Sequence, residues 1–171
     1  MKKRLLLPLL VIVMILAGWV LEGAAGTIGG SQRAMESFLF RLEGGNIRTL
    51  KTAEDGNYTA ILYESPEGIR TCAMFERKLL SLRSLYRGMQ RDAQDGGLQL
   101  TGGWTEGGIR PSRCDAVVWG DNSNGEVTAY SLNYGVSGET AVTCTEVPAE
   151  YILHLYDLDG APAFPGNLRL E

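Results

Sequence analysis

The hydrophobic pattern of this chain begins with one long uninterrupted run. Residues Leu5 to Leu21 form a charge-free stretch of about 17 residues, directly after the basic cluster Lys2–Arg4. At a helical rise of about 1.5 Å per residue, the run spans roughly 25 Å, close to the ~30 Å hydrocarbon core of a bilayer. Because basic residues stay on the cytoplasmic side, the pattern predicts one membrane-spanning helix through residues 5–21 and an exported C-terminal part.

Cleavage of this N-terminal segment is the alternative. The small residues Gly23, Ala24 and Ala25 follow the apolar run, where a signal peptidase would read them. Residues 1–25 are therefore predicted to be either a signal-anchor or a signal peptide. The expected location is the cell membrane, with the C-terminal domain outside the cell, or the exterior after cleavage near Ala25.

A short helix is predicted soon after this segment. Residues 26–31 are rich in glycine and predict a flexible linker. From Gln32 to Glu43 apolar residues recur at helical spacing, Ser31 is a suitable N-cap, and Gly44–Gly45 predicts the C-terminal end. We expect this amphipathic helix to pack on a β-sheet.

Beyond Asn46 the pattern changes to short strands separated by turns. The β-branched and aromatic run Asn57–Glu64 and its neighbour Ile69–Glu76 predict a hairpin around a Ser-Pro-Glu-Gly turn. The runs Asp115–Gly120 and Glu126–Leu132 predict a second hairpin, because the Asn-Gly pair between them favours a tight turn.

Other parts of the chain are less regular. Two further strands are predicted at residues 139–147 and 151–157. Residues 77–90 fit either an amphipathic helix or two short strands, since the period of so short an apolar segment does not separate the two. Residues 98–108 contain two Gly-Gly pairs and predict a long loop.

Together these elements predict an α+β fold: an N-terminal transmembrane or signal helix, a short amphipathic helix and a mainly antiparallel β domain. Residues 32–171 show no change of composition that would mark a second domain. A segment of roughly 150 residues is long enough to bury one core. We therefore expect a single extracytoplasmic β-rich domain.

The distribution of charge narrows the choice of partners. All 20 acidic residues follow the apolar run, whereas three of the 16 basic residues precede it, so the exported part carries a net charge of about −7. Nucleic-acid binding requires a basic surface and is not expected.

The three cysteines leave an odd one in an oxidising compartment. Cys114 and Cys144 are the predicted disulfide pair, because both lie in strand-like runs of the C-terminal half. The alternative is that all three cysteines are small buried hydrophobic residues. No two of them have the spacing of metal ligands, and we expect neither a zinc site nor another cofactor.

A group of arginines and one tryptophan form a possible contact patch. If residues 77–90 were helical, Arg83, Arg87 and Arg91 would form a stripe that could contact anionic lipid headgroups or an acidic wall polymer. Trp104, within the glycine-rich segment, could stack on a sugar of such a polymer. The simpler interpretation is that the arginines balance nearby acids and Trp104 orders its loop.

Few residues point to catalysis. The single histidine, His154, shares a predicted strand face with Ile152 and Tyr156, and we interpret it as a half-buried structural residue. Asp157 and Asp159 are the carboxylates that a hydrolase could use as acid and base. The same Asp-rich turn lacks the later ligands of an EF-type calcium loop, so no metal site is predicted.

The plan of the chain rests on three features: the hairpin Asn57–Phe75 followed by Arg77–Leu80, the strands Ala116–Gly120 and Val127–Leu132, and the terminal Tyr156–Gly160. In this plan the chain resembles uncharacterised small exported proteins of Gram-positive bacteria. The resemblance includes no catalytic motif and implies strands for residues 77–90.

We expect an exported or membrane-anchored envelope protein that acts as a non-enzymatic binding or accessory module. Its partners would be the membrane, through residues 5–21, and an envelope protein or wall polymer. The alternatives are an extracytoplasmic hydrolase and an envelope-signalling accessory that acts through its transmembrane helix.

Overall fold

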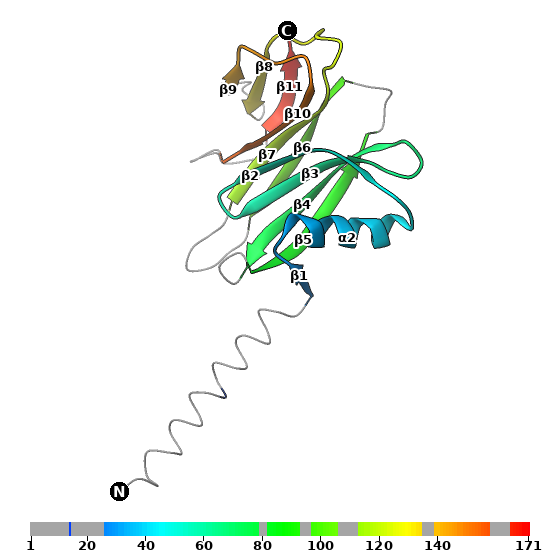
Figure 1. Cartoon of the computed structure of the whole chain (residues 1–171). Helices are drawn as coiled ribbons and strands as arrows, with labels where there is room; N and C mark the ends of the chain where they lie inside the picture. The colour runs from blue at the N-terminus through cyan, green and yellow to red at the C-terminus, as the bar shows by residue number, and fades with distance from the viewer. Residues whose placement is uncertain are drawn as a thin grey trace, which may run out of the picture.

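The computed structural model describes residue 14 and residues 26–78, 82–92, 97–105, 113–134, 139–157 and 165–171 (Figure 1). At some strand positions, Trp104 and Cys114 among them, only the backbone is described. In the described part of the chain, no helix has the length and apolar character needed to cross a membrane. The predicted spanning segment 5–21, apart from Met14, and the predicted cleavage region near Ala25 lie outside the described residues.

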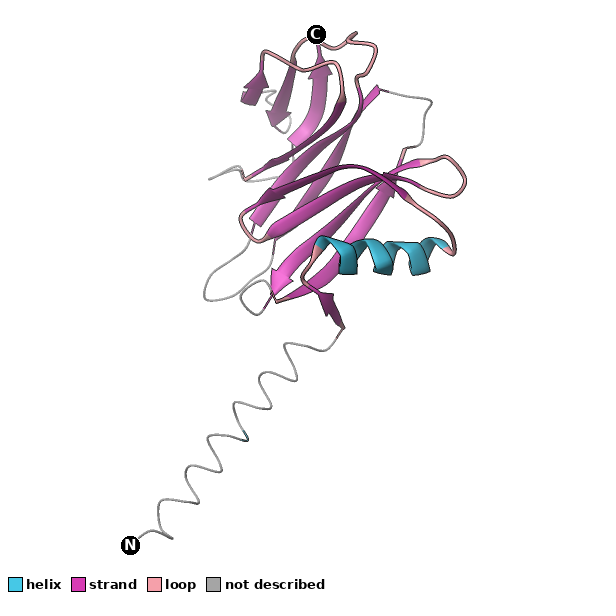
Figure 2. Ribbon diagram, in the orientation of Figure 1, coloured by secondary structure: helices cyan, strands magenta, loops and turns pink. Residues whose placement is uncertain are grey.

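The described residues confirm an α+β fold that is mostly antiparallel sheet (Figure 2). Sheet A has the strand order β1 (Thr27–Gly29), β5 (Arg83–Arg91), β4 (Arg70–Lys78), β3 (Tyr58–Glu64) and β2 (Arg48–Asp55). Sheet B has the order β10 (Tyr151–Tyr156), β7 (Arg113–Asp121) and β6 (Gly97–Thr105). Sheet C has the order β11 (Pro165–Leu170), β8 (Tyr130–Tyr134) and β9 (Glu139–Cys144).

Helix α2 (Gln32–Glu43) has the limits that its sequence predicts. The Ser31 side chain accepts a hydrogen bond from the Ala34 backbone N–H, which satisfies one of the free donors at the start of the helix. At the other end Gly44 adopts the left-handed conformation, with φ of 70°, which a residue without a Cβ reaches at little cost. Both ends of α2 are therefore set by local chemistry.

The layers are stacked in the order α2, sheet A, sheet B, sheet C. Met35 and Leu39 of α2 pack against Ile61, Ala73 and Phe75 on one face of sheet A. Side chains alternate along a strand, so the neighbouring residues point to the opposite face, where they meet sheet B. This second core contains Ala60, Leu62, Met74, Val117, Trp119 and Leu153.

Sheet B is covered on both faces, which explains the unbroken apolar run of β7. Val117 and Trp119 face sheet A, whereas Ala116 and Val118 pack against Tyr130 and Leu132 of sheet C. All four of these β7 residues are fully buried. The Trp119 Nε1–H donates a hydrogen bond of 2.6 Å to Thr101 Oγ1, so its polar group is also satisfied.

Two predictions about strand pairing are wrong. Much of the predicted loop 98–108 forms β6, which pairs with β7 along its length because Leu98 and Leu100 reach the core between sheets B and C. The predicted hairpin between the runs Asp115–Gly120 and Glu126–Leu132 does not form, because β7 lies in sheet B and β8 in sheet C.

The side chain of Asn122 explains why the chain leaves sheet B after β7. Its amide donates hydrogen bonds to the carbonyls of Val127 and Pro148, and its oxygen accepts one from the Val127 N–H. These bonds hold the backbone in an irregular path toward sheet C. A hairpin, in contrast, would have turned the chain back along β7.

Other segments of the chain take up strands. Within the predicted linker, residues Thr27–Gly29 form β1 and pair with β5. Residues 77–90 contribute to β4 and β5, in agreement with the strand interpretation; residues 79–81 lie outside the description. Strand β11, after the last predicted element, adds an edge to sheet C.

Candidate functional site

One groove lies where the edges of the three sheets come together. Strand β2 ends the described order of sheet A, β10 that of sheet B and β9 that of sheet C. The groove has a volume of about 510 Å³ and is open to solvent. We call it the edge groove; it is lined by Ala53, Glu54, Asp55, Cys144, Leu153, His154, Leu155 and Tyr156.

A hydrogen-bonded cluster of Tyr130, His154 and Tyr156 lies at one wall of the edge groove. The Tyr130 hydroxyl is 2.5 Å from His154 Nδ1 and also hydrogen-bonds to the Tyr156 hydroxyl. Alternation along β10 places His154 and Tyr156 on the face that meets sheet C, where β8 supplies Tyr130. We call these three residues the tyrosine–histidine cluster.

Burial keeps the tyrosine–histidine cluster uncharged. It lowers the pKa of His154 below its usual value of 6.5; the positive charge of Lys51 acts in the same direction, and Glu150 opposes it. Burial likewise raises the pKa of the Tyr130 and Tyr156 phenols. At neutral pH His154 and Tyr156, the two members that line the groove, are therefore neutral and suit hydrogen bonding to a ligand, whereas Tyr130 is 1% exposed and bonds to both of them.

The opposite lip of the edge groove is acidic. Glu54 and Asp55 lie at the end of β2, and both are exposed. Glu54 forms an ion pair with Arg77, so the positive charge of Arg77 offsets the negative charge of Glu54. Asp55 closes the turn into β3, opposite Tyr58, and adds a second carboxylate to the lip.

Lys51 joins two walls of the edge groove at one end. Its Nζ donates hydrogen bonds to Glu150 Oε1 at 2.6 Å and to the Tyr151 backbone carbonyl at 2.9 Å. The hydrogen bond from Lys51 also lowers the pKa of Glu150. Lys51 thus links β2 to the beginning of β10 and limits the groove on that side.

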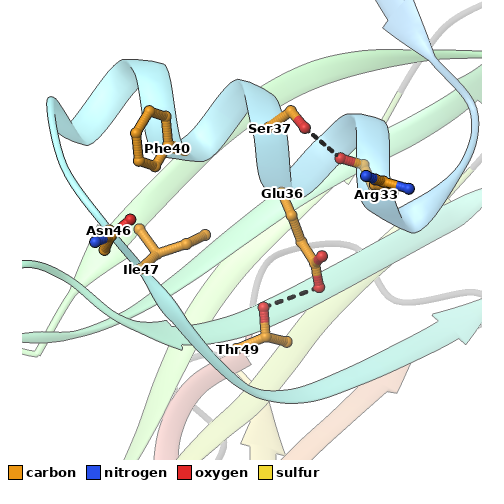
Figure 3. Close-up of a pocket in the computed structure, with 7 residues that line it drawn as sticks. All are labelled: Arg33, Glu36, Ser37, Phe40, Asn46, Ile47 and Thr49. Atoms are coloured by element: carbon orange, nitrogen blue, oxygen red, sulfur yellow. Dashed lines mark hydrogen bonds between the residues drawn. The ribbon is translucent and has the colours of Figure 1, made fainter.

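A second hollow lies between α2 and the beginning of β2 (Figure 3). It measures about 280 Å³. Its polar groups bond largely to one another: Thr49 donates to Glu36 Oε1 at 2.9 Å, and the Ser37 hydroxyl donates to the Arg33 carbonyl at 2.7 Å. The edge groove is larger, at about 510 Å³, and the edges of three sheets meet there, so it is the better candidate for a ligand site.

The structure does not bring Arg83, Arg87 and Arg91 into one stripe, because an extra residue at Arg87 in β5 shifts the alternation that would otherwise place them on one strand face. Arg83 donates to the hydroxyl and carbonyl of Thr27, and Arg91 donates to Glu43 Oε2. The register of β4 and β5 shifts near Arg87, which leaves this residue in a bulge.

Arg87 takes part in a buried ion cluster. It binds the carboxylate of Glu76, which is 1% exposed and also accepts an ion pair from Lys78. All three arginines of the predicted patch thus have partners within the chain. Trp104 lies on β6 opposite Cys114, and its side chain is outside the described part. Contact of these residues with lipid or polymer stays a prediction.

The predicted disulfide is not tested either. Cys72 and Cys144 are free thiols in the structure, and the side chain of Cys114 is outside the description. Cys144 lies opposite Tyr130 in the pairing of β8 with β9, at the wall of the edge groove.

The predicted carboxylates and turns have local roles where they are described. Asp157 follows β10, and Asp159 lies outside the described residues. Asp121 accepts hydrogen bonds from the Ser123 N–H and from Arg70 Nη1. Burial raises the pKa of Asp121. These bonds and the charge of Arg70 outweigh burial and hold the pKa below its usual value. Among the described residues, no group of three or more His, Cys, Asp or Glu side chains could hold a metal ion.

Sequence reasoning noted His154 and Tyr156 but missed the edge groove. Its other walls come from β2 and β9, which are distant in sequence and belong to other sheets. The one available signal was the alternation that places His154 and Tyr156 on the same strand face. Comparison with protein-family models, with curated proteins and with solved structures found no match for this chain.

Proposed function

We propose that this protein is an exported, membrane-anchored module of the cell envelope that binds another envelope component in the edge groove. The observation that carries the proposal is the composition of that groove: neutral hydroxyl and imidazole groups on one wall, carboxylates on the other and leucines between them. A site with a few placed polar groups on an apolar floor is typical of ligand recognition.

Binding accounts for this chemistry better than nucleophilic catalysis does. A general base needs a neighbouring group that orients it and stabilises its charged form, most often a carboxylate. His154 instead bonds to a phenol, and its environment disfavours the charged form. The tyrosines have raised pKa values, so their hydroxyls are poor nucleophiles near neutral pH. The cluster therefore serves as a set of neutral donors and acceptors.

The anchor is proposed on sequence grounds and can be tested by the intact mass of the protein from its native host. A spanning segment at residues 5–21 predicts the full-length mass in the membrane fraction. A mass truncated near Ala25 would contradict the anchor and indicate a released protein. The same spectrum, after thiol alkylation without reduction, reports how many of the three cysteines are free.

The binding role can be tested by photocrosslinking in native membranes. A photoreactive phenylalanine analogue at Asp55, on the lip of the edge groove, is expected to form one discrete adduct. The matched control carries the analogue at Phe40, which is similarly exposed but lies at the second hollow. Addition of Ala53→Trp places an indole in the groove and should remove the Asp55 adduct.

Equal labelling from Asp55 and Phe40, or labelling that survives Ala53→Trp, would contradict a role for the edge groove. The mass of the adduct also separates a protein partner from a wall polymer. These outcomes do not depend on which class of ligand occupies the site.

A further inference from the structure

We propose that the ligand of the edge groove is an extended basic peptide segment that pairs with β10 as an added strand of sheet B. This inference rests on the function proposed above and specifies its partner class. It is carried by the direction of the backbone groups of β10, by the position of the groove and by the charge of its lip.

The backbone of β10 directs alternate groups to its two sides. Asn122 N–H, at the end of β7, donates to the Glu150 carbonyl, so residue 150 faces β7. Successive residues of a strand direct their N–H and C=O groups to opposite sides. Tyr151, Leu153 and Leu155 therefore face away from β7, and the bond from Lys51 Nζ to the Tyr151 carbonyl comes from that side.

The side of β10 that faces away from β7 has no strand partner among the described residues. Lys51 occupies the position at Tyr151, whereas Leu153 and Leu155 line the edge groove. An unpaired strand edge is a template for another extended chain, and peptide recognition by strand addition uses such an edge. Leu153 is 2% exposed, so the backbone groups of Leu155 are the most open to such a segment, and the groove supplies the space.

The walls of the groove determine the side chains that an added strand would carry. Its residues would point alternately toward Asp55 on the β2 lip and toward the wall with His154 and Tyr156; Glu54 points to the other face of sheet A, where it pairs with Arg77. Lysine or arginine suits the first set of positions, because Asp55 offers an exposed carboxylate there. Small hydroxyl residues suit the second, because the tyrosine–histidine cluster offers neutral hydrogen-bonding groups. The expected segment alternates basic and small polar residues.

The test uses the full-length protein in detergent micelles and a fluorescein-labelled decapeptide of alternating lysine and threonine. Fluorescence anisotropy should show saturable binding, and the peptide of alternating glutamate and threonine should bind at least about tenfold more weakly. N-methylation of the amides that would face β10 should weaken binding by a further factor of about ten or more, because each lost bond leaves a buried acceptor unpaired.

A variant of the protein tests the same bond from the other side. Leu155→Pro removes the N–H that faces the groove and leaves the bonds to β7 in place, as proline permits on an edge strand. Leu155→Ala removes more of the side chain than proline does but keeps the N–H, so it is the control for lost packing. We expect Leu155→Pro to bind the lysine–threonine peptide at least about tenfold more weakly than Leu155→Ala.

If Leu155→Pro fails to fold, the binding of the N-methylated peptide alone tests whether the ligand pairs with the backbone of β10. Unchanged binding after N-methylation would overturn strand addition in favour of a purely electrostatic contact. Equal binding of the glutamate and lysine peptides would overturn the basic segment. If the groove-specific adduct at Asp55 proves to be a polymer, the peptide proposal is overturned and the proposed binding function still stands. If labelling at Asp55 is not specific to the groove, both the peptide proposal and the binding function are overturned.

Discussion

His154 has two features that make it a direct reporter of the edge groove. It is the single histidine of the chain, and its ring bonds to Tyr130 from a neighbouring sheet. Its charge state depends on burial and on Lys51, which in turn is bonded across the end of the groove. A change at the groove is therefore expected to alter the titration of one residue that a spectrum can identify without assignment.

The titration of His154 by NMR gives the first prediction at this scale. Its midpoint should lie below 6.5, because burial lowers the pKa. Lys51→Met should raise the midpoint, because it removes a nearby positive charge, and Glu150→Gln should lower it. Below pH 6.5 the unfolded chain takes up this proton more readily than the folded one, so stability should decrease as pH falls toward the midpoint. A midpoint at or above 6.5 would contradict the buried, uncharged cluster.

At the scale of elements, glycine positions test the pairing of β6 with β7. Gly88 and Gly120 have nearly the same backbone angle, with φ of 148° and 149°. A Cβ at Gly88 would meet no atom within 4 Å, whereas at Gly120 it would lie 2.1 Å from the Gly97 carbonyl oxygen. The backbone strain of an alanine is thus similar at the two positions, and only one of them adds a clash.

We expect Gly88→Ala to lower the free energy of unfolding by about 1–3 kcal/mol, the usual cost of an unfavourable backbone conformation. Gly120→Ala should cost about 1–3 kcal/mol more, because the start of β6 must move away from β7. Urea unfolding of both variants measures the difference. Equal losses would show that β6 does not approach β7 closely at Gly97.

The elements differ in how far the sequence predicts them. Helix α2 was predicted to the residue, because Ser31 and Gly44 act on adjacent backbone groups. The pairing of β7 was not, since its partners β6 and β10 are set by burial on both faces and come from distant parts of the chain. The turn Asp121–Gly125 has hairpin chemistry, but the contacts of Asn122 with Val127 and Pro148 override it.

At the scale of the whole molecule, the stacking of three sheets creates the edge groove. Sequence analysis named His154 and Tyr156, but Glu54 and Asp55 meet them only because sheets A and B bring the edges of β2 and β10 together. No short stretch of sequence predicts such a site, because its walls come from edge strands of different sheets that meet only in the folded protein. The predicted membrane segment is the reverse case, because its prediction depends on composition alone and needs no tertiary contact.

The unpaired side of β10 also affects how copies of this protein behave toward one another. An unpaired strand edge can pair with the same edge of a second molecule, which is a common route to aggregation. Each copy, however, carries Asp55 on the lip of the groove, and the chain after residue 21 has a net charge of about −7, so two such edges repel. Selection of the proposed basic partner and protection against self-association would thus come from the same negative charge. High salt or acid, which weaken that repulsion, would remove both together.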